Sequence, residues 1–140
     1  MTSTTIRQVC HRVLAQDKYL MKDGTTWCNY ALHDILSALG LPDFAYDKVA
    51  GRPLLANDIC EKLERTCPKL TYTEAFEAAR AGSIVVAALR EPYHGHVALV
   101  YPFPGMYTSG KWKRSDLPCV ANVGKENGVM PLNWAFGATP

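Results

Sequence analysis

Residues 24–42 have the sequence GTTWCNYALHDILSALGLP, in which Cys28 stands just before an apolar pattern with helical spacing. The Gly-Leu-Pro run at residues 40–42 ends that pattern, because glycine accepts the left-handed cap conformation and proline cannot continue a helix. Thr25 or Thr26 is expected to cap the start of the helix. A thiol in a first helical turn feels the positive end of the helix dipole, which favours the reactive thiolate. The pattern therefore predicts that Cys28 is a nucleophile.

The rest of the chain changes from helical to strand periodicity along its length. Helices are expected over residues 5–20, after an Asn57 cap up to residue 66, and over residues 71–81, where Thr71 and Glu74 fit a capping box. Strands are expected over residues 84–89, 96–101, 119–123 and 130–136, with a turn at 124–128 and loops at 42–56 and 102–117. Helices first and strands last predict an α+β fold with a mainly antiparallel sheet.

Length and composition fit a small globular domain. The 140 residues are 48% hydrophobic, so one domain over residues 1–140 can bury a core without crosslinks. The net charge of +2 argues against a dedicated nucleic-acid binder, and the basic residues Lys111, Lys113 and Arg114 are expected in a solvated loop. The N-terminus has no apolar signal core, and no run approaches the ~20 apolar residues of a membrane span. We expect synthesis in the cytoplasm without a signal peptide.

The five cysteines suggest neither a disulfide framework nor a metal site. Their number is odd and their spacing matches no zinc ribbon. Cys10 and Cys60 lie on inward helix faces and are expected to pack in the core. His94, His96 and Cys119 would make an incomplete zinc set, because no further ligand completes it. We expect no metal and no cofactor.

His96 is the candidate partner of the cysteine. It opens the strand at residues 96–101 and follows Gly95, which permits close approach of backbone or substrate. An imidazole held next to Cys28 could stabilise the thiolate and then pass its proton to a leaving amine. His94 would share the same strand face, but it belongs to the preceding loop and is the second choice for the base.

An asparagine is expected to orient the imidazole. A histidine base works best when an acceptor holds its second ring nitrogen. Asn122 is the first candidate, because a neighbouring strand could place it beside His96, and Asn133 is the second. The backbone N–H of Cys28 is the natural oxyanion donor, and the side chain of Asn29 could assist it or lie on the helix surface.

Five short segments of the chain recur in a known family: residues 27–29 (WCN), 39–42 (LGLP), 56–57 (AN), 79–82 (ARAG) and 95–100 (GHVALV). With them the chain resembles the NlpC-type papain-like peptidoglycan amidases. Within that family it is most similar to small amidase effectors delivered by bacterial type VI secretion, and to compact phage or cell-wall lysins. The resemblance implies a papain-like single domain with Cys28 as nucleophile and His96 as base. Asn122 takes the place of a third polar residue that varies among members.

The resemblance also implies a substrate and a partner. The expected reaction is hydrolysis of an amide bond in peptidoglycan peptide stems through an acyl-enzyme. Tyr107, Trp112 and Lys113 are expected to line one wall of the substrate groove, with Asn29 nearby. An effector would be exported to the periplasm or cell wall of target bacteria, and a cognate immunity protein would protect the producing cell.

Three alternatives remain open from the sequence. A phage or cell-wall lysin would use the same chemistry. An acyltransferase or deamidase would keep the Cys28–His96 dyad and change the acceptor, which the product mass would reveal. A non-catalytic binding module would keep the fold, and its thiol would have an ordinary pKa.

Overall fold

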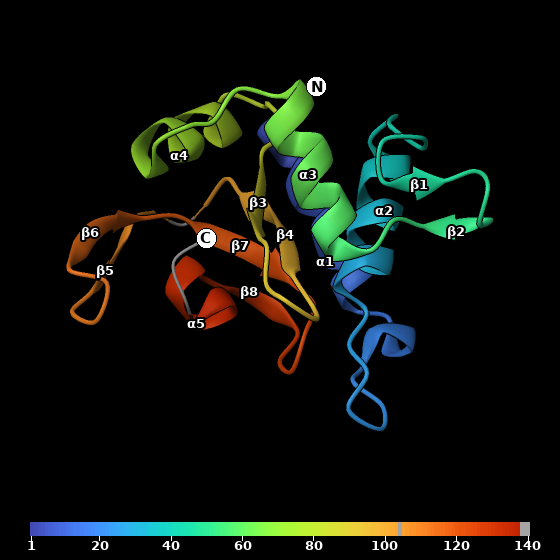
Figure 1. Ribbon diagram of the computed structural model, residues 1–140. Helices are drawn as coiled ribbons and strands as arrows, with labels where there is room; N and C mark the ends of the chain where they lie inside the picture. The colour runs from blue at the N-terminus through green and yellow to red at the C-terminus, as the bar shows by residue number, and fades with distance from the viewer. Residues whose placement is uncertain (104, 138–140) are drawn as a thin grey trace.

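The computed structural model describes residues 1–103 and 105–137 and confirms the mixed α+β class (Figure 1). Helices dominate the first half of the chain and strands the second, as the change of periodicity predicts. The helices are α1 (Ser3–Leu14), the short 3₁₀ helix η1 (Asp17–Tyr19), α2 (Cys28–Ala38), α3 (Ala56–Thr66), α4 (Tyr72–Arg80) and α5 (Leu132–Phe136).

The strands form an antiparallel sheet with the order β3-β4-β7-β8, together with two separate hairpins. Its strands are β3 (Val86–Leu89), β4 (His96–Tyr101), β7 (Cys119–Asn122) and β8 (Gly128–Pro131). The hairpins are β1 (Tyr46–Asp47) with β2 (Arg52–Pro53), and β5 (Tyr107–Ser109) with β6 (Arg114–Leu117). The strand at residues 96–101 is confirmed with its expected bounds, and it occupies the interior of the sheet.

Alternate residues of β4 divide the core between the two faces of the sheet. Val97, Leu99 and Tyr101 pack in a cluster with α1 and α2. Ala98 and Val100 pack in a second cluster with side chains of α4 and α5. Successive strand residues point to opposite faces, so a single strand can hold both helical layers.

Two helix starts differ from the predicted caps. The residue before α2 is Trp27, which makes no side-chain capping bond, so the expected cap at Thr25 or Thr26 is wrong. Helix α3 begins one residue before Asn57, which is therefore not its cap. The Asn57 amide instead bonds both the N–H and the carbonyl of Glu91, a contact between distant segments that outweighs its capping preference.

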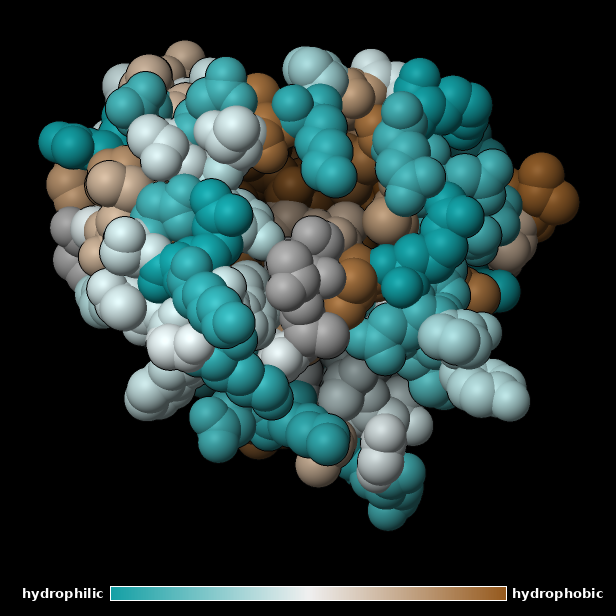
Figure 2. Space-filling view, turned by 60° about the vertical axis from the view of Figure 1, so that its left-hand side comes forward, coloured by the Kyte–Doolittle hydropathy of each residue, from teal (hydrophilic) through white to brown (hydrophobic). Residues whose placement is uncertain are grey.

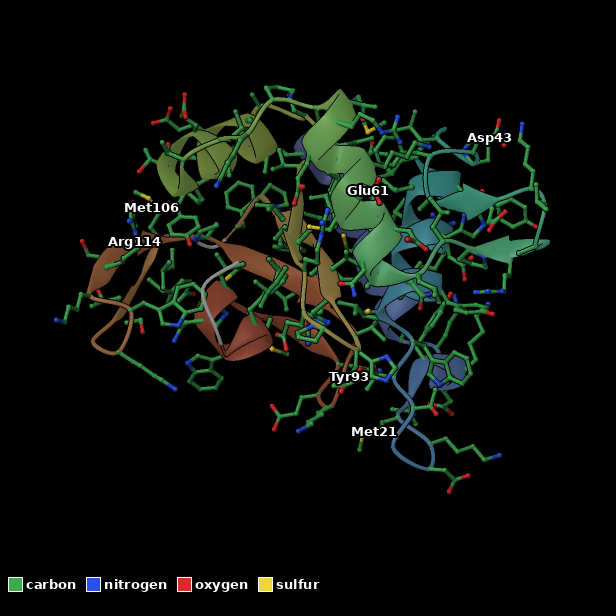
Figure 3. The ribbon with its side chains drawn as sticks, in the orientation of Figure 1. Met21, Asp43, Glu61, Tyr93, Met106 and Arg114 are labelled. Carbon is green, nitrogen blue, oxygen red and sulfur yellow. The ribbon has the colours of Figure 1, made fainter. Side chains whose placement is uncertain are left out.

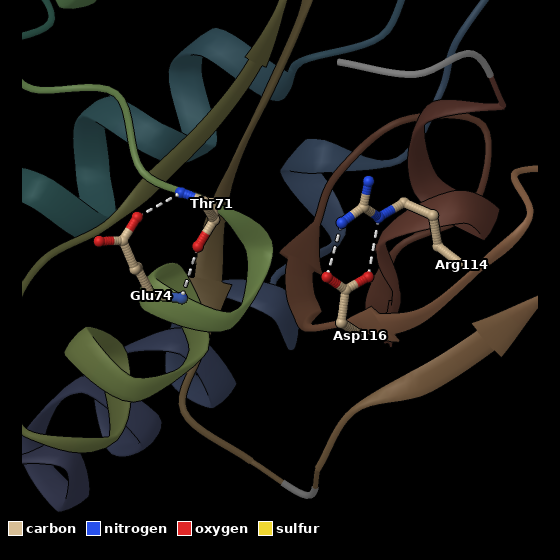
Figure 4. A network of polar contacts seen from close by, with 4 residues as sticks. All are labelled: Thr71, Glu74, Arg114 and Asp116. Carbon is tan, nitrogen blue, oxygen red and sulfur yellow. Dashed lines mark hydrogen bonds and ion pairs between the residues drawn. The ribbon is translucent and has the colours of Figure 1, made fainter.

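Helix α4 begins as predicted. The Thr71 hydroxyl accepts from the N–H of Glu74, and the Glu74 carboxylate accepts from the N–H of Thr71, which completes the capping box (Figure 4). These two bonds pair donors that would otherwise be free at the helix start.

The predicted loop at residues 102–117 is wrong, because this stretch contains the β5–β6 hairpin. Arg114 and Asp116 form a two-bond ion pair on β6 (Figure 4), and the Arg114 guanidinium lies over the Tyr72 ring of α4. The predicted strand at residues 130–136 is also wrong in its second half, which is α5. Proline at position 131 ends the strand and suits the start of a helix.

Strand β3 is an edge strand and forms the floor of an apolar groove of about 780 Å³ between α3 and α4. The space-filling view shows a hydrophobic hollow between more polar rims (Figure 2). Among the described residues that line it, Cys28, His96 and Asn122 do not appear. This groove is therefore separate from the residues that the sequence marks as reactive.

Gly95 occupies a position where the chain comes close to itself. A Cβ at this residue would overlap the Asn57 side-chain oxygen and lie 2.7 Å from the Leu89 carbonyl oxygen. The expected close approach is thus made by the protein's own chain, and it holds the turn that leads into His96 against α3.

We expect Gly95→Ala to lower the free energy of unfolding by about 1–3 kcal/mol, because the added methyl group forces the turn and Asn57 apart. Urea denaturation followed by circular dichroism measures the change. Gly110→Ala is the matched control, since a Cβ there meets no atom within 4 Å. Equal stability of the Gly95→Ala variant and the wild type would contradict this packing argument.

Candidate active site

Cys28 is the first residue of α2 and its side chain is buried, with 7% of the residue exposed. The sulfur lies within hydrogen-bonding reach of the backbone N–H groups of Cys28, Asn29 and Val97. The first two belong to the unpaired donors of a helix start. The third follows His96 directly in β4, so the thiol reaches the strand end that carries the histidine.

The local field does not ionise this thiol. The three N–H groups each lower the pKa of Cys28, but burial has the larger effect and raises it above the ordinary cysteine value. The expected preformed thiolate is therefore not favoured in this structure, and Cys28 is neutral near pH 7. Cys10 lies deep in the α1 face, where burial raises its pKa to about 12.

His96 and Asn122 form the hydrogen bond that the sequence predicts. The His96 Nε2 to Asn122 Oδ1 distance is 2.5 Å. The register of β4 on β7 pairs Leu99 with Ala121, which carries Asn122 to the position opposite Ala98 and onto the face of His96. Strand pairing thus brings together two residues that are 26 positions apart in the sequence.

The hydrogen bonds around Asn122 define the histidine tautomer. The Asn122 amide nitrogen donates to the carbonyl of Glu126 at 2.9 Å, and a carbonyl oxygen can only accept. Oδ1 is therefore the atom that faces His96, and Nε2 must carry the proton that it accepts. In the neutral imidazole the lone pair is then on Nδ1, the nitrogen available as a base.

Burial also keeps the imidazole neutral. It lowers the pKa of His96, while the hydrogen bond that His96 donates to Asn122 and the charge of Glu91 oppose that shift. The Phe136 ring of α5 meets the His96 ring edge-on, with centroids 4.7 Å apart. The site accordingly holds a neutral thiol and a neutral imidazole.

The thiol and the ring approach β4 from different sides. Cys28 belongs to the cluster with α1 and α2, whereas His96 contacts Phe136 on the other face. Among the described residues, no hydrogen bond joins Sγ of Cys28 to the His96 ring. Met21 and Tyr93, which belong to the loops before the two residues, are both exposed (Figure 3).

Asn29 is held away from a role in substrate contact. Its amide nitrogen donates to the Leu54 carbonyl at 3.0 Å and ties the start of α2 to the segment before α3. This placement supports the helix-surface alternative, and the backbone N–H groups stay the predicted oxyanion donors.

The predicted groove wall lies at the far end of β7 from Asn122. Tyr107 contacts Cys119, the first residue of β7. The Trp112 ring packs on Tyr72 of α4, and its indole N–H donates to the Gly137 carbonyl. Lys113 is exposed on the β5–β6 turn with a positive φ of 54°. The structure does not bring these three side chains together with Cys28.

The second-choice residues take no part in the His96–Asn122 hydrogen bond. His94 is exposed in the loop before β4, and Asn133 lies in α5 with its side-chain oxygen buried and unpaired among the described residues. Cys119 packs in the cluster on the opposite sheet face from His96. Within residues 1–103 and 105–137, no group of three or more His, Cys, Asp or Glu side chains could hold a metal ion.

Sequence reasoning missed the residue that joins the two halves of the site. Asn127 accepts from the N–H of Gly124, next to His96, and donates to the carbonyl of Tyr19 at 3.0 Å. It therefore couples the turn after β7 to the segment that leads into α2. Its position in a turn was predicted, but no sequence signal pointed to a contact 108 positions away.

No family model matches the chain, and no curated protein matches it. No helix in the described part of the chain is long and apolar enough to cross a membrane.

We expect alkylation of Cys28 by iodoacetamide to accelerate about tenfold per pH unit between roughly pH 6 and pH 8, because a raised thiol pKa keeps the thiolate scarce there. Peptide mapping by mass spectrometry measures the rate at Cys28, in a Cys67→Ser background that removes the exposed cysteine. A rate that stays constant across this range would indicate a preformed thiolate–imidazolium pair and contradict the neutral assignment.

Proposed function

We propose that this protein is a papain-like cysteine amidase of the NlpC type that hydrolyses amide bonds in the peptide stems of peptidoglycan. The observation that carries the proposal is the His96–Asn122 hydrogen bond, which leaves Nδ1 as a free base at the strand end that also contacts Sγ of Cys28. The class and substrate come from the resemblance in the WCN and GHVALV segments, and the geometry is compatible with that class.

In the first step Sγ of Cys28 attacks the substrate carbonyl carbon while Nδ1 of His96 accepts the thiol proton. The carbonyl oxygen becomes an oxyanion, and the N–H groups at the start of α2 are the donors nearest to it. When the C–N bond breaks, the imidazolium returns the proton to the leaving amine. A thioester to Cys28 remains.

In the second step water replaces the amine as the partner of the histidine. Nδ1 removes a proton from water, the hydroxide attacks the thioester, and the thiol leaves with a proton from the imidazolium. Asn122 keeps its acceptor on Nε2 throughout and stabilises the ring when it is charged.

A neutral pair makes proton transfer unfavourable before the substrate binds. Every unit by which the Cys28 pKa exceeds that of His96 costs about 1.4 kcal/mol. The cost is recovered as the C–S bond forms and the oxyanion meets its donors. Reaction also requires Nδ1 to reach hydrogen-bonding distance of Sγ, a contact that in unbound enzymes often tightens only with substrate.

We propose further that the enzyme acts in the cell wall of target bacteria and that the producing cell makes an inhibitory immunity protein. The similarity to small type VI effectors supports this setting. A lysin of the same chemistry would have the same substrate without such a partner.

We expect the wild type to digest purified sacculi and Cys28→Ala to lose all activity, because the thioester cannot form. His96→Ala should lose about 10²–10⁴-fold in rate, since it removes the base. Asn122→Ala should lose about 10²-fold, since the ring remains but is no longer oriented. Mass spectrometry of the released muropeptides measures each rate.

Cys67→Ala and His94→Ala are the matched controls, because both residues are exposed and lie outside the site. Equal digestion by the wild type and Cys28→Ala would refute the nucleophile assignment. Products that gain an acceptor group in place of water would identify an acyltransferase.

The lowered pKa of His96 predicts a specific acid limit of activity. The base form exists above the pKa and disappears as the pH falls through it, so kcat/KM should remain high until below about pH 6.5, the ordinary histidine value. A pH profile measured on soluble muropeptides tests this. An acid limb centred above that value would contradict the burial argument.

A further inference from the structure

A small pocket of about 170 Å³ opens beside the start of α2. Its described lining residues are Lys18, Tyr19, Trp27, Tyr30 and Asp34. The Trp27 and Tyr30 rings meet edge-on at 5.3 Å, and both are partly exposed. The pocket therefore combines aromatic walls with one carboxylate and one ammonium group.

Helix geometry brings three of these side chains to one stripe next to the thiol. Trp27, Tyr30 and Asp34 follow each other at intervals of three and four residues, whereas Cys28 turns toward the core. Trp27 is bonded directly to Cys28 along the chain.

Asp34 is held in a fixed orientation by a buried tyrosine. The Tyr19 hydroxyl donates to Oδ2 of Asp34. Burial and the Asp34 carboxylate raise the pKa of Tyr19, so this hydroxyl stays protonated and remains a donor. Oδ1 of Asp34 accepts no hydrogen bond from any described side chain or N–H group. One carboxylate oxygen is thus free to accept from a ligand.

The Lys18 ammonium is a weak competitor for that carboxylate. It lies 3.5 Å from Oδ2 of Asp34, with 61% of its side chain exposed against 34% for Asp34. Exposed ion pairs contribute little to stability, so a ligand ammonium can replace Lys18 at small cost. The aromatic walls give a bound cation a second source of attraction.

The pocket is connected to the histidine side of the site as well. The carbonyl of Tyr19 accepts from Asn127, whose side-chain oxygen holds the N–H of Gly124. A Cβ on Gly124 would lie 3.4 Å from Cε1 of His96. The pocket wall and the imidazole are therefore joined through one turn.

We propose that this pocket is a substrate subsite that binds a primary ammonium group on a residue flanking the scissile amide. The inference rests on the proposed amidase function and specifies its substrate: peptide stems with a free amino group should be preferred over stems in which that amine is acylated. Asp34 accepts the ammonium hydrogen bond, Trp27 and Tyr30 face the cation, and Lys18 moves aside.

The binding test uses n-pentylammonium chloride as the probe and the neutral 1-pentanol as its uncharged analogue. The chemical shift of the Trp27 indole N–H, assigned with Trp112→Phe and Trp134→Phe variants, reports occupancy of the pocket. We expect saturable binding of pentylammonium only. Asp34→Asn should weaken it about tenfold or more, and Lys18→Ala should strengthen it several-fold, because the competing cation is gone.

The opposite signs of these two effects distinguish a cation site from general damage. The exposed pair Asp43 and Lys48, 3.8 Å apart, supplies matched controls in Asp43→Asn and Lys48→Ala, which should leave binding unchanged. Equal binding of pentanol and pentylammonium, or weaker binding in Lys18→Ala, would overturn the proposal.

A kinetic test applies the same variants to muropeptides with a free or an N-acetylated diamino acid. Asp34→Asn should raise KM about tenfold for the free amine, with kcat and the hydrolysis of the acetylated stem unchanged. An unchanged KM in this variant would reject the subsite while leaving the amidase intact. If the wild type cuts neither substrate, the amidase proposal fails, and the probe titration still decides whether the pocket binds ammonium groups.

Discussion

The pairing of β4 with β7 builds the histidine half of the candidate active site. It places His96 and Asn122 on one face and fixes the imidazole tautomer through the Glu126 carbonyl. Beyond Leu99 and Ala121 the two strands no longer form a regular ladder, and the N–H of Val97 is directed to Sγ of Cys28 instead. A shift of one residue in this register would turn the asparagine to the other face and separate the pair.

Burial has a larger effect on the pKa values of Cys28 and His96 than the hydrogen bonds around them have. A helix start stabilises a nearby negative charge by about 0.3–1 kcal/mol at the surface and up to about 2 kcal/mol in partly buried positions. Removing a thiolate from water costs more than that when the residue is as enclosed as Cys28. The same enclosure lowers the pKa of His96, so both members of the dyad become neutral together. In the proposed amidase, activation then depends on what the substrate contributes when it binds.

Sequence patterns predicted the features that depend on neighbouring residues. The Thr71 capping box and the strand from His96 to Tyr101 arise from local chemistry and periodicity, and both were found with the expected bounds. Features that depend on distant contacts were missed. The Asn57 side chain suits a helix cap but bonds Glu91 instead. The chain after Tyr101 folds into a hairpin, and its charged and aromatic residues obscure the alternation of apolar and polar residues that predicts a strand. The His96–Asn122 pair was predictable because both residues lie in predicted strands that could be neighbours in the sheet.

The pKa of the Cys28 thiol could not be predicted from the sequence. A pattern shows that the residue begins a helix, but it does not show how deeply the side chain is buried. The position of Cys28 at the start of α2 correctly suggested stabilising N–H groups, and only the packing of α2 against β4 shows that burial exceeds their effect. The same limit applies to the Asp34 pocket. Its residues come from a 3₁₀ turn, a loop and a helix, and Asn127, from the other half of the chain, anchors the carbonyl of Tyr19. The pocket wall and the His96 ring are thus joined through one turn, so under the proposed function a ligand in the pocket can influence the position of His96.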